Sequence, residues 1–343
     1  MQSIFKGLKQ YINFIIPMLF LWGCTSDQVQ LQKIQGYALG TSYHISYVSN
    51  TLKPEQLTEK VDSIFGVLNQ SLSTYLPDSD ISKINKGDSL LQVDEHFIKV
   101  YKKATEVWNH SEGYFDPTVG ALVNAYGFGP GVPLKKVTSK QRDSLLEFTG
   151  WEKTKLTSRN TIQKTNSKLF FDFNALAKGY AVDVIAAYLQ NQDLAHYLVE
   201  IGGELVARGK SPRSGEFWKI AIDNPQQEQE RSFIQTLTLQ NEALATSGNY
   251  RKKSVDPETG LIFAHSINPK TGAAFPTEVL SASVIAPDCM TADAYATALM
   301  VMPLTLSQQL INSRPELEAY WVVADSLGGV KELFSASFLK EKN

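Results

Sequence analysis

Segments with strand and helix periodicity follow one another in this chain without regular alternation, and this order restricts the fold more than any other feature. Residues 37–48 alternate between apolar and polar side chains, as a strand does. The next segment opens at Pro54 and repeats its apolar residues at helical spacing, as does the segment 97–108. Regular alternation would predict a parallel α/β sheet, whereas this order predicts an α+β fold with mixed antiparallel sheets and packed helices.

The second half of the chain continues this mixture. The apolar triplet Leu169–Phe171 predicts a short strand, and helices are predicted from about Ala175 and over about 291–302. Further strands are predicted at 195–201, 217–223, 233–246 and 279–286. No second linker is visible after Gly36, so we expect residues 36–343 to form a single large domain.

The N-terminus has the pattern of an export signal rather than of a folded element. Two lysines precede the apolar run Tyr11–Gly23, which is too short to span a bilayer comfortably. The run ends at Cys24 in a sequence that resembles the lipobox of bacterial lipoproteins. We therefore predict a lipoprotein signal peptide over 1–23 and a tether over 24–35, lipidated at Cys24. The alternative is an ordinary signal peptide followed by an incidental cysteine.

These features predict an exported protein, held at the periplasmic face of a bacterial membrane by its lipid anchor, with the inner membrane favoured over the outer. Besides Cys24, the only cysteine is Cys289, so no internal disulfide is expected. The net charge is −2, from 33 Lys and Arg against 35 Asp and Glu. Such a balance gives no broad cationic surface for phosphate backbones, and we expect no nucleic-acid partner.

The glycine-rich stretch Gly127–Gly131 lacks both the preceding strand and the spacing of a dinucleotide-binding fingerprint. The sequence also contains no P-loop. A nucleotide site in this chain is therefore of neither the Rossmann nor the Walker type.

Several segments carry residues suited to chemistry. The main ones are Asp172–Ala181, Gly202–Glu204, His265–Gly272 and Thr291–Leu299. Their order, content and spacing resemble those of the ApbE family of FAD:protein FMN transferases. The upstream segments Leu39–Thr41, Ser73–Tyr75 and Gly113–Pro117 fall where that family has its remaining motifs. The resemblance covers nearly all of residues 36–325. It implies an ApbE-like, T-fold-related domain, and an enzyme that moves the FMN part of FAD onto a threonine hydroxyl of an acceptor protein, releasing AMP.

The predicted metal site centres on Asp293 and Thr297. They lie four residues apart on a predicted helix, so their oxygens project from one face, and such hard ligands suit magnesium. The resemblance implies that Mg²⁺ is held by Asp293, Thr297 and an oxygen of Ala175, which for alanine is the carbonyl. Some family members have a second aspartate where this chain has Ala296. The alternative is a solvated aspartate beside a threonine bonded to its own backbone.

The predicted FAD site begins at the helix that carries Lys178. A lysine near a helix start adds its charge to free N–H groups that already favour anions, although an exposed helix lysine is the commoner case. Asp172 either binds the ligand or caps this helix. The resemblance implies FAD contacts for Leu39, Tyr75, Tyr114, Phe115, Asp116, Asp172, Lys178 and Ile267. The aromatic members suit stacking on flat rings. The alternatives are core positions for them, and turns at Asp116–Pro117 and Gly202–Gly203.

His265 is the one histidine of five that lies inside these motifs. Transfer to a hydroxyl requires removal of its proton, and imidazole titrates near neutral pH, so we predict His265 as the general base, with a structural role as the alternative. The turn Asn268–Gly272 follows it, with Asn268 where the family usually has aspartate. The similar turn Asp256–Gly260 shows that the turn alone is not the functional signal.

The predicted mechanism uses magnesium and Lys178 to neutralise the FAD pyrophosphate while the acceptor threonine attacks the FMN-side phosphorus. By family resemblance, the acceptors are subunits of membrane electron-transport complexes of the Na⁺-translocating NADH:quinone reductase or Rnf type. Two other functions fit the same motifs. One is an FAD pyrophosphatase that uses water and yields FMN and AMP, and the other is a lipoprotein that binds flavin without chemistry.

Overall fold

The computed structural model describes residues 30–225, 232–249, 253–255, 262–274, 277–325 and 329–338. Cys24, the predicted signal peptide and the turn Asp256–Gly260 lie outside these residues. None of the helices within the described ranges has the length and apolar character needed to cross a membrane.

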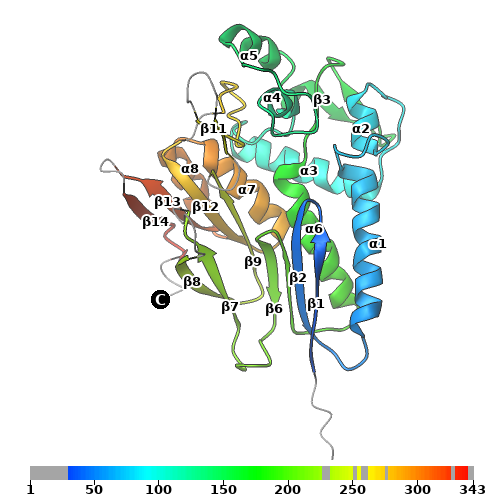
Figure 1. Cartoon of the computed structure of the whole chain (residues 1–343), viewed down its shortest axis with the longest axis vertical. Coiled ribbons are helices and arrows are strands. Elements are labelled where there is room, and N and C mark those ends of the chain that lie inside the picture. Colours follow the sequence, from blue (N-terminus) through cyan, green and yellow to red (C-terminus); the bar gives the residue numbers. More distant parts are fainter. Residues whose placement is uncertain are drawn as a thin grey trace, which may run out of the picture.

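An eight-stranded sheet forms the centre of the structure, with the strand order β1-β2-β5-β6-β9-β12-β13-β14 (Figure 1). All neighbouring strands in it pair antiparallel. Its strands are β1 (Leu31–Ala38), β2 (Thr41–Val48), β5 (Tyr197–Ile201), β6 (Glu204–Arg208), β9 (Ala243–Gly248), β12 (Val279–Ala286), β13 (Glu318–Ala324) and β14 (Val330–Phe334). Three two-stranded sheets add β3 (Thr154–Leu156) with β4 (Ile162–Lys164), β7 (Trp218–Asp223) with β8 (Phe233–Leu239), and β10 (Lys253–Val255) with β11 (Ile262–Ala264).

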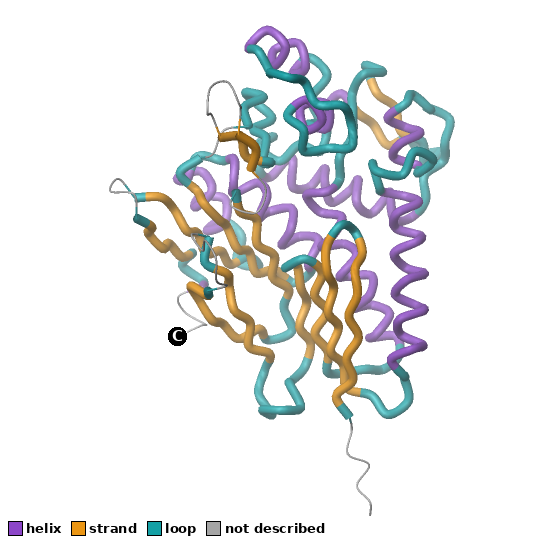
Figure 2. The backbone as a smooth tube through the Cα atoms, in the orientation of Figure 1, coloured by secondary structure: helices purple, strands orange, loops and turns teal. Residues whose placement is uncertain are grey.

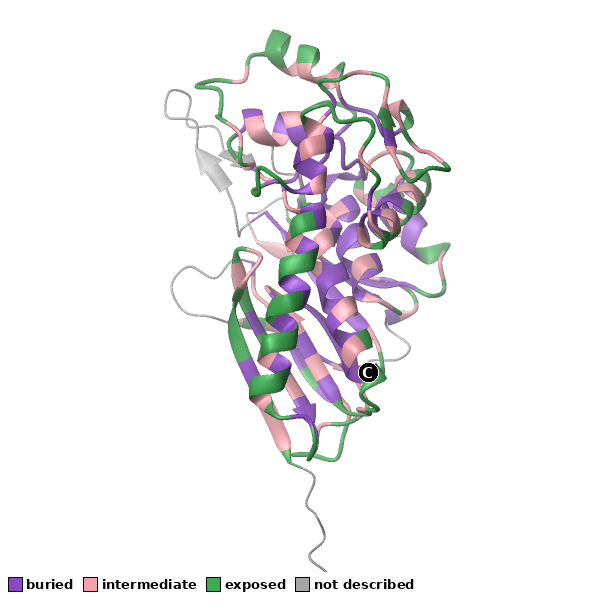
Figure 3. Ribbon diagram, turned by 90° about the vertical axis from the view of Figure 1, so that its right-hand side faces the viewer, coloured by how far each residue is buried: buried purple, intermediate pink, exposed green. Residues whose placement is uncertain are grey.

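Helices cover one face of the main sheet and carry their exposed residues on the outer side (Figures 2 and 3). The long ones are α1 (Pro54–Leu72), α3 (Glu95–His110), α6 (Asn174–Asn191) and α7 (Cys289–Val301). The others are α2 (Asp80–Asn85), α4 (Gly120–Ala125), α5 (Ser139–Leu146), the 3₁₀ turn η1 (Trp151–Lys153) and α8 (Leu304–Asn312). The β7–β8 hairpin packs on the opposite face of the sheet, where Trp218 and Leu239 join Leu205 and Tyr320 in a second apolar cluster. This architecture confirms the predicted α+β class.

Two predicted boundaries were wrong at the start of the domain. Residues 31–35, assigned to the tether, form the first part of β1, which pairs with β2 along its whole length. The predicted strand 37–48 is the end of β1, a two-residue turn at Leu39–Gly40, and β2. Leu39 has φ +52° and Gly40 +75°, as a type I′ hairpin turn requires. Leucine has no preference for that conformation, so this turn is not predicted from the sequence.

Two other strand predictions also needed correction. The segment 233–246 is interrupted at Gln240–Glu242, where Asn241 has φ +63°, and so divides into β8 and the start of β9. The triplet Leu169–Phe171 makes only an isolated bridge, between Phe170 and Val119. Three residues with one bridging partner cannot build a ladder, although Leu169 and Phe171 are fully buried as predicted for an apolar segment.

Candidate active site

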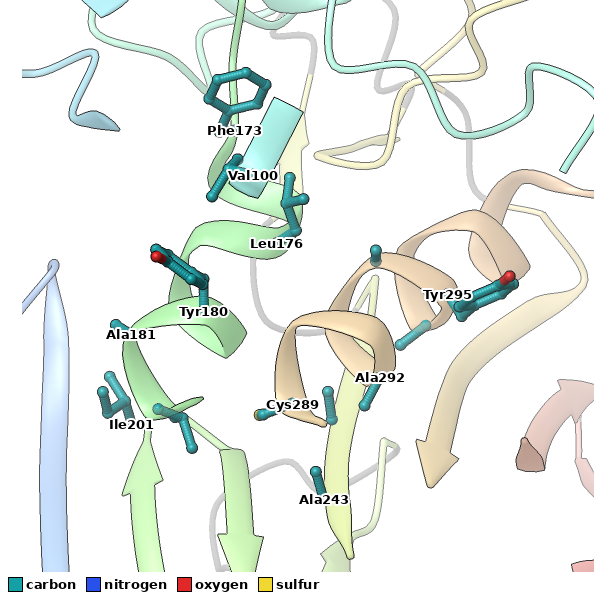
Figure 4. Packing of buried hydrophobic residues seen from close by; sticks show 14 of the residues in the cluster. Val100, Phe173, Leu176, Tyr180, Ala181, Ile201, Ala243, Cys289, Ala292 and Tyr295 are labelled. Carbon is teal, nitrogen blue, oxygen red and sulfur yellow. The ribbon is translucent and has the colours of Figure 1, made fainter. Parts of the chain in front are cut away.

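The helices α6 and α7 lie side by side at the centre of the molecule and carry the predicted lysine and metal ligands (Figure 4). Both are buried on most sides, because the sheet lies on one side of them and other helices on the other. Gly179 of α6 allows the close approach, since a Cβ there would collide with the carbonyl oxygen of Cys289. The predicted ligands on the two helices are thereby brought together.

An ionic cluster occupies this contact. Lys178 Nζ lies 2.9 Å from Glu204 Oε1 of β6 and 3.8 Å from Asp293 Oδ2 of α7. The N–H of Gly179 donates to Asp293 Oδ2 at 3.0 Å. Glu204 and Asp293 are only 3% and 2% exposed. Lys178 is therefore not a free surface lysine, and Asp293 is not a solvated aspartate. The second oxygen of Glu204 is buried without a hydrogen-bond partner.

The oxygens at this contact fit a hard divalent cation. Burial raises the pKa of the Asp293 carboxyl above its usual range, and the charge of Lys178 only partly opposes this. A bound cation would remove the penalty of a dry carboxylate. Among the described residues, every hydrogen bond and ion pair of Asp293 uses Oδ2, which leaves Oδ1 for a ligand.

The two other predicted ligands also have suitable oxygens. Thr297 lies one turn beyond Asp293, and its hydroxyl contacts Ser247 Oγ of β9 at 3.3 Å rather than its own helix backbone. The Ala175 carbonyl lies one helical turn before the Gly179 N–H, which donates to Asp293, so this carbonyl is on the side of α6 that faces Asp293. Within the described ranges, no group of three His, Cys, Asp or Glu side chains could hold a metal. A cation here would thus need the hydroxyl and the carbonyl as well as Asp293, a donor set that suits magnesium.

Two hairpin turns lie beside this cluster at the end of the sheet. Gly202 and Gly203 connect β5 to β6 with φ +64° and +103°, and the N–H of Gly202 donates to Ser42 O at 3.0 Å. A Cβ on Gly202 would lie 2.7 Å from Thr41 Cγ2, so its glycine is needed for contact with the β1–β2 hairpin. The turn is thus a strand connection, and it lies against the β1–β2 hairpin, whose own turn contains Leu39.

The aromatic residues of the predicted FAD site come from several loops. Tyr75 is 56% exposed, and its hydroxyl donates to Phe128 O at 3.5 Å. The Phe128 ring meets His265 edge to face, with centroids 6.4 Å apart. The ammonium of Lys270 lies 4.2 Å from the centre of the Tyr114 ring. The loops that carry Tyr75, the glycine-rich stretch and His265 therefore meet one another.

The remaining predicted FAD residues have side chains engaged in the protein itself. Asp172 Oδ1 accepts the N–H of Asn174 at the start of α6, at 2.9 Å, while the Asp172 N–H donates to Pro117 O at 2.8 Å. Phe115 and Ile267 are buried in apolar clusters. For Phe115 the geometry favours the core position that was the alternative to stacking, and Ile267 is buried in the same way.

Asp116 is fully engaged as well. Its Oδ1 accepts from the N–H and hydroxyl of Thr118 at 2.8 and 2.6 Å, and its Oδ2 accepts the N–H of Trp151 at 2.9 Å. These bonds form the turn that was the alternative to ligand binding. Burial nevertheless raises the pKa of Asp116 from 3.8 to about 6.

This pKa predicts a pH-dependent difference in stability. Because the folded state holds the proton more tightly than the unfolded state, the stabilisation is full at low pH and is lost as pH rises through about 6. We expect the free energy of unfolding of the wild type to fall, relative to that of Asp116→Asn, by on the order of 2–3 kcal/mol between about pH 4 and pH 8. Urea unfolding at both pH values measures this difference, and parallel pH dependences would contradict the assignment.

The sequence-based prediction gave no role to Glu204, although the Gly202–Gly203 pair before it marked the position. The four histidines outside the motifs all have partners in the protein. These are His44 with Glu200 Oε2 (2.9 Å), His96 with Tyr180 Oη (2.8 Å), His110 with Tyr295 Oη (2.6 Å) and His196 with the Lys210 N–H (3.0 Å). Each of these contacts is consistent with the surface or packing role predicted for these histidines.

The fold and the site together define an α+β protein with an acidic, lysine-bearing centre buried between two helices at an antiparallel sheet. The model of the ApbE family matches residues 39–321, and the chain belongs to this family. The sequence resemblance is thereby confirmed.

Relatives match over nearly the whole chain. The FAD:protein FMN transferase of Vibrio cholerae is 34% identical over 338 residues, covering 96% of this chain and 98% of the relative. That of Haemophilus influenzae is 32% identical over 342 residues, covering 96% and 97%. Among solved structures, the flavin transferase ApbE from Vibrio cholerae has a TM-score of 0.81 at 33% identity, covering 90% of this chain and 99% of that one. The apo flavinyl transferase ApbE of Pseudomonas stutzeri has a TM-score of 0.79 at 28% identity, covering 92% and 99%.

Proposed function

We propose that this chain is an enzyme that transfers the FMN moiety of FAD to a threonine hydroxyl of another protein, using Mg²⁺ and releasing AMP. Its full-length similarity to proteins named FAD:protein FMN transferase supports flavin transfer to a protein. The observation that supports the metal-dependent chemistry is the ionic cluster between α6 and α7, in which Lys178 contacts the buried carboxylates of Glu204 and Asp293.

In this mechanism Lys178 and the start of α6 hold the pyrophosphate of FAD. The Lys178 ammonium is positioned by Glu204 and lies near the start of α6, where the positive end of the helix dipole favours anions. Magnesium, when bound by Asp293, Thr297 and the Ala175 carbonyl, supplies positive charge to the phosphate oxygens. Together these charges stabilise the negative charge that develops on the transferred phosphoryl group.

His265 accepts the proton of the acceptor threonine as its oxygen attacks the FMN-side phosphorus. One P–O bond forms to the threonine, and the bond to the bridging oxygen breaks, so AMP leaves.

The loop of His265 is linked to α7 by Asn268, whose Nδ2 donates to Val301 O at 3.5 Å. The Asn268 carbonyl side-chain oxygen also accepts the Lys270 N–H at 2.9 Å. An amide can make both contacts, whereas the family's usual aspartate can only accept. This link between the loop and α7 supports the proposal that His265 and the metal ligands of α7 are held in fixed positions relative to each other.

The rate of AMP release tests this function against the pyrophosphatase alternative. With FAD and Mg²⁺ alone, AMP release should be slow, because water is not held in line with the phosphorus. A threonine-bearing acceptor should raise the rate strongly, and its Thr→Ala variant should not. We expect the acceptor to be an exported-side subunit of a Na⁺-translocating NADH:quinone reductase or Rnf-type complex. Equal AMP release with and without acceptor would favour hydrolysis instead.

We also propose that the protein is exported and anchored by a lipidated Cys24 at the periplasmic face of the membrane, with the inner membrane favoured. The position of β1 is compatible with this anchor. The strand begins at Leu31, shortly after Cys24, and runs toward the turn at Leu39 beside the candidate site. An anchor at Cys24 would hold the domain from the opposite end of β1 and leave the site open to a protein acceptor.

Replacement of the lipidated residue tests the anchor. Cys24→Ser should give a protein that fractionates as soluble or remains an unprocessed precursor, because no thiol is available for acylation. Membrane fractionation and the mobility of the protein on gels measure both outcomes, with Cys289→Ser as the control for loss of a thiol. A Cys24→Ser protein that stays in the membrane with mature mobility would refute the lipoprotein prediction.

A further inference from the structure

The N-terminus of α7 is held by a side chain of α6 that has no role in the mechanism above. Asp183 Oδ1 accepts the N–H of Cys289, and Asp183 Oδ2 accepts the N–H of Met290, both at 2.8 Å. These donors are among the first N–H groups of α7, which have no partner within their own helix. One carboxylate thus satisfies two free donors of the neighbouring helix, and its charge lies at the positive end of that helix's dipole.

The same two helices are joined in the reverse direction further along. Asp293 of α7 accepts the N–H of Gly179 of α6, so each helix gives a carboxylate to the backbone of the other. The backbones approach closely beside these bonds, because Gly179 lies against the Cys289 carbonyl. Two reciprocal bonds on either side of a close contact restrict the sliding of α7 along α6.

This restriction matters because the proposed ligands are divided between the helices. Ala175 and Lys178 belong to α6, whereas Asp293 and Thr297 belong to α7. A slide by one residue would move one set about 1.5 Å past the other. Magnesium requires near-ideal octahedral geometry at about 2.0–2.1 Å, so a displacement of even part of that step would weaken its binding.

We propose that Asp183 is a positioning residue that fixes α7 against α6 and thereby sets the distance between the magnesium ligands of the two helices. This inference rests on the magnesium site of the proposed function. Asp183 also lines a cavity of about 250 Å³ together with Arg208 and Asp288. After truncation of Asp183, water from this cavity can hydrate the freed N–H groups but cannot hold the helices together.

Asp288 provides a matched control. It is the N-cap of α7, where Oδ1 accepts the Thr291 N–H and Oδ2 accepts the Thr291 hydroxyl, both at 2.8 Å. Within the part of the chain that the structure describes, the side-chain hydrogen bonds of Asp288 stay in the N-terminal turn of α7 and none reaches α6. Asp288→Ala therefore removes a carboxylate cap from the same helix end without separating the two helices.

The test is a calorimetric titration of the FAD-loaded full chain with MgCl₂, together with the melting temperature of each variant. We expect Asp183→Ala to raise the Kd for Mg²⁺ by roughly 10- to 100-fold, as is usual for loss of a group that orients metal ligands. Asp288→Ala should lower the melting temperature as well but leave the Kd within about twofold of the wild type. If a general loss of stability were the cause of weaker Mg²⁺ binding, both variants would show a similar rise in Kd.

Equal Mg²⁺ affinities of the Asp183→Ala and Asp288→Ala variants would overturn the inference. If Asp183→Ala does not fold, Asp183→Asn replaces it, since asparagine keeps the shape and one accepting oxygen. That variant should show a smaller rise in Kd, and an unchanged Kd would equally overturn the inference. A wild type that binds no Mg²⁺ would refute the proposed metal site and this inference together, whereas normal wild-type binding with unchanged variants refutes the inference alone.

Discussion

Asp293→Ala should abolish magnesium-dependent turnover while leaving the fold intact. The variant loses the only side-chain carboxylate of the proposed ligand set, and a metal ion stabilises the transition state by several kcal/mol, equivalent to roughly a thousandfold or more in rate. The structural cost is smaller. It consists of the Gly179 N–H left without its acceptor and the loss of the weaker ion pair to Lys178, which keeps Glu204. An unsatisfied buried donor costs about 1–3 kcal/mol.

The Asp293→Asn variant tests whether the negative charge of residue 293, rather than its shape, is needed for Mg²⁺ binding. Asparagine fills the same space and can still accept from Gly179, but it supplies a neutral oxygen that binds Mg²⁺ poorly. AMP release from FAD over a range of Mg²⁺ concentrations, with circular dichroism of each variant, measures both effects. Unchanged activity at limiting Mg²⁺ in either variant, with a normal spectrum, would exclude Asp293 as a ligand.

His265→Ala should lower the rate of the transfer step by roughly 10²- to 10⁴-fold with little change in FAD affinity. In the proposed mechanism the imidazole removes a proton during transfer, whereas Lys178 and the start of α6 hold the phosphates. Single-turnover kinetics and a fluorescence titration of FAD separate the two quantities. His196→Ala is a suitable control, because His196 is exposed, lies outside the motifs and accepts the N–H of Lys210. Loss of FAD binding in His265→Ala would instead make His265 a positioning residue.

The elements that the sequence predicts well are those whose side chains repeat with one clear period. The apolar positions Leu57, Val61, Ile64 and Leu68 recur at helical spacing, and all of them face the core in α1. Strand predictions were wrong where the turn between two strands could not be recognised from the sequence. Leu39 adopts a left-handed conformation in a turn, and leucine has no preference for it, so β1 and β2 were read as one strand.

The parts of the site that lie on one helix or in one loop were also predictable. The spacing of Asp293 and Thr297 is enough to put both on one side of a helix. The roles of Glu204 and Asp183 depend on contacts between elements far apart in the chain. The bond between Asp183 and Cys289 joins residues 106 positions apart, and no local pattern encodes such a pairing. Only the packing of α6 on α7 and β6 reveals it.

We propose that FMN becomes covalently attached to a separate protein, and the intact mass of the acceptor tests this proposal. The acceptor is incubated with the enzyme, FAD and Mg²⁺, denatured, and weighed by mass spectrometry beside its Thr→Ala variant. We predict that the acceptor gains the mass of one FMN, that the bond survives denaturation, and that the Thr→Ala acceptor and the enzyme itself keep their masses. Release of FMN and AMP with an unmodified acceptor would contradict the account and identify the protein as a pyrophosphatase.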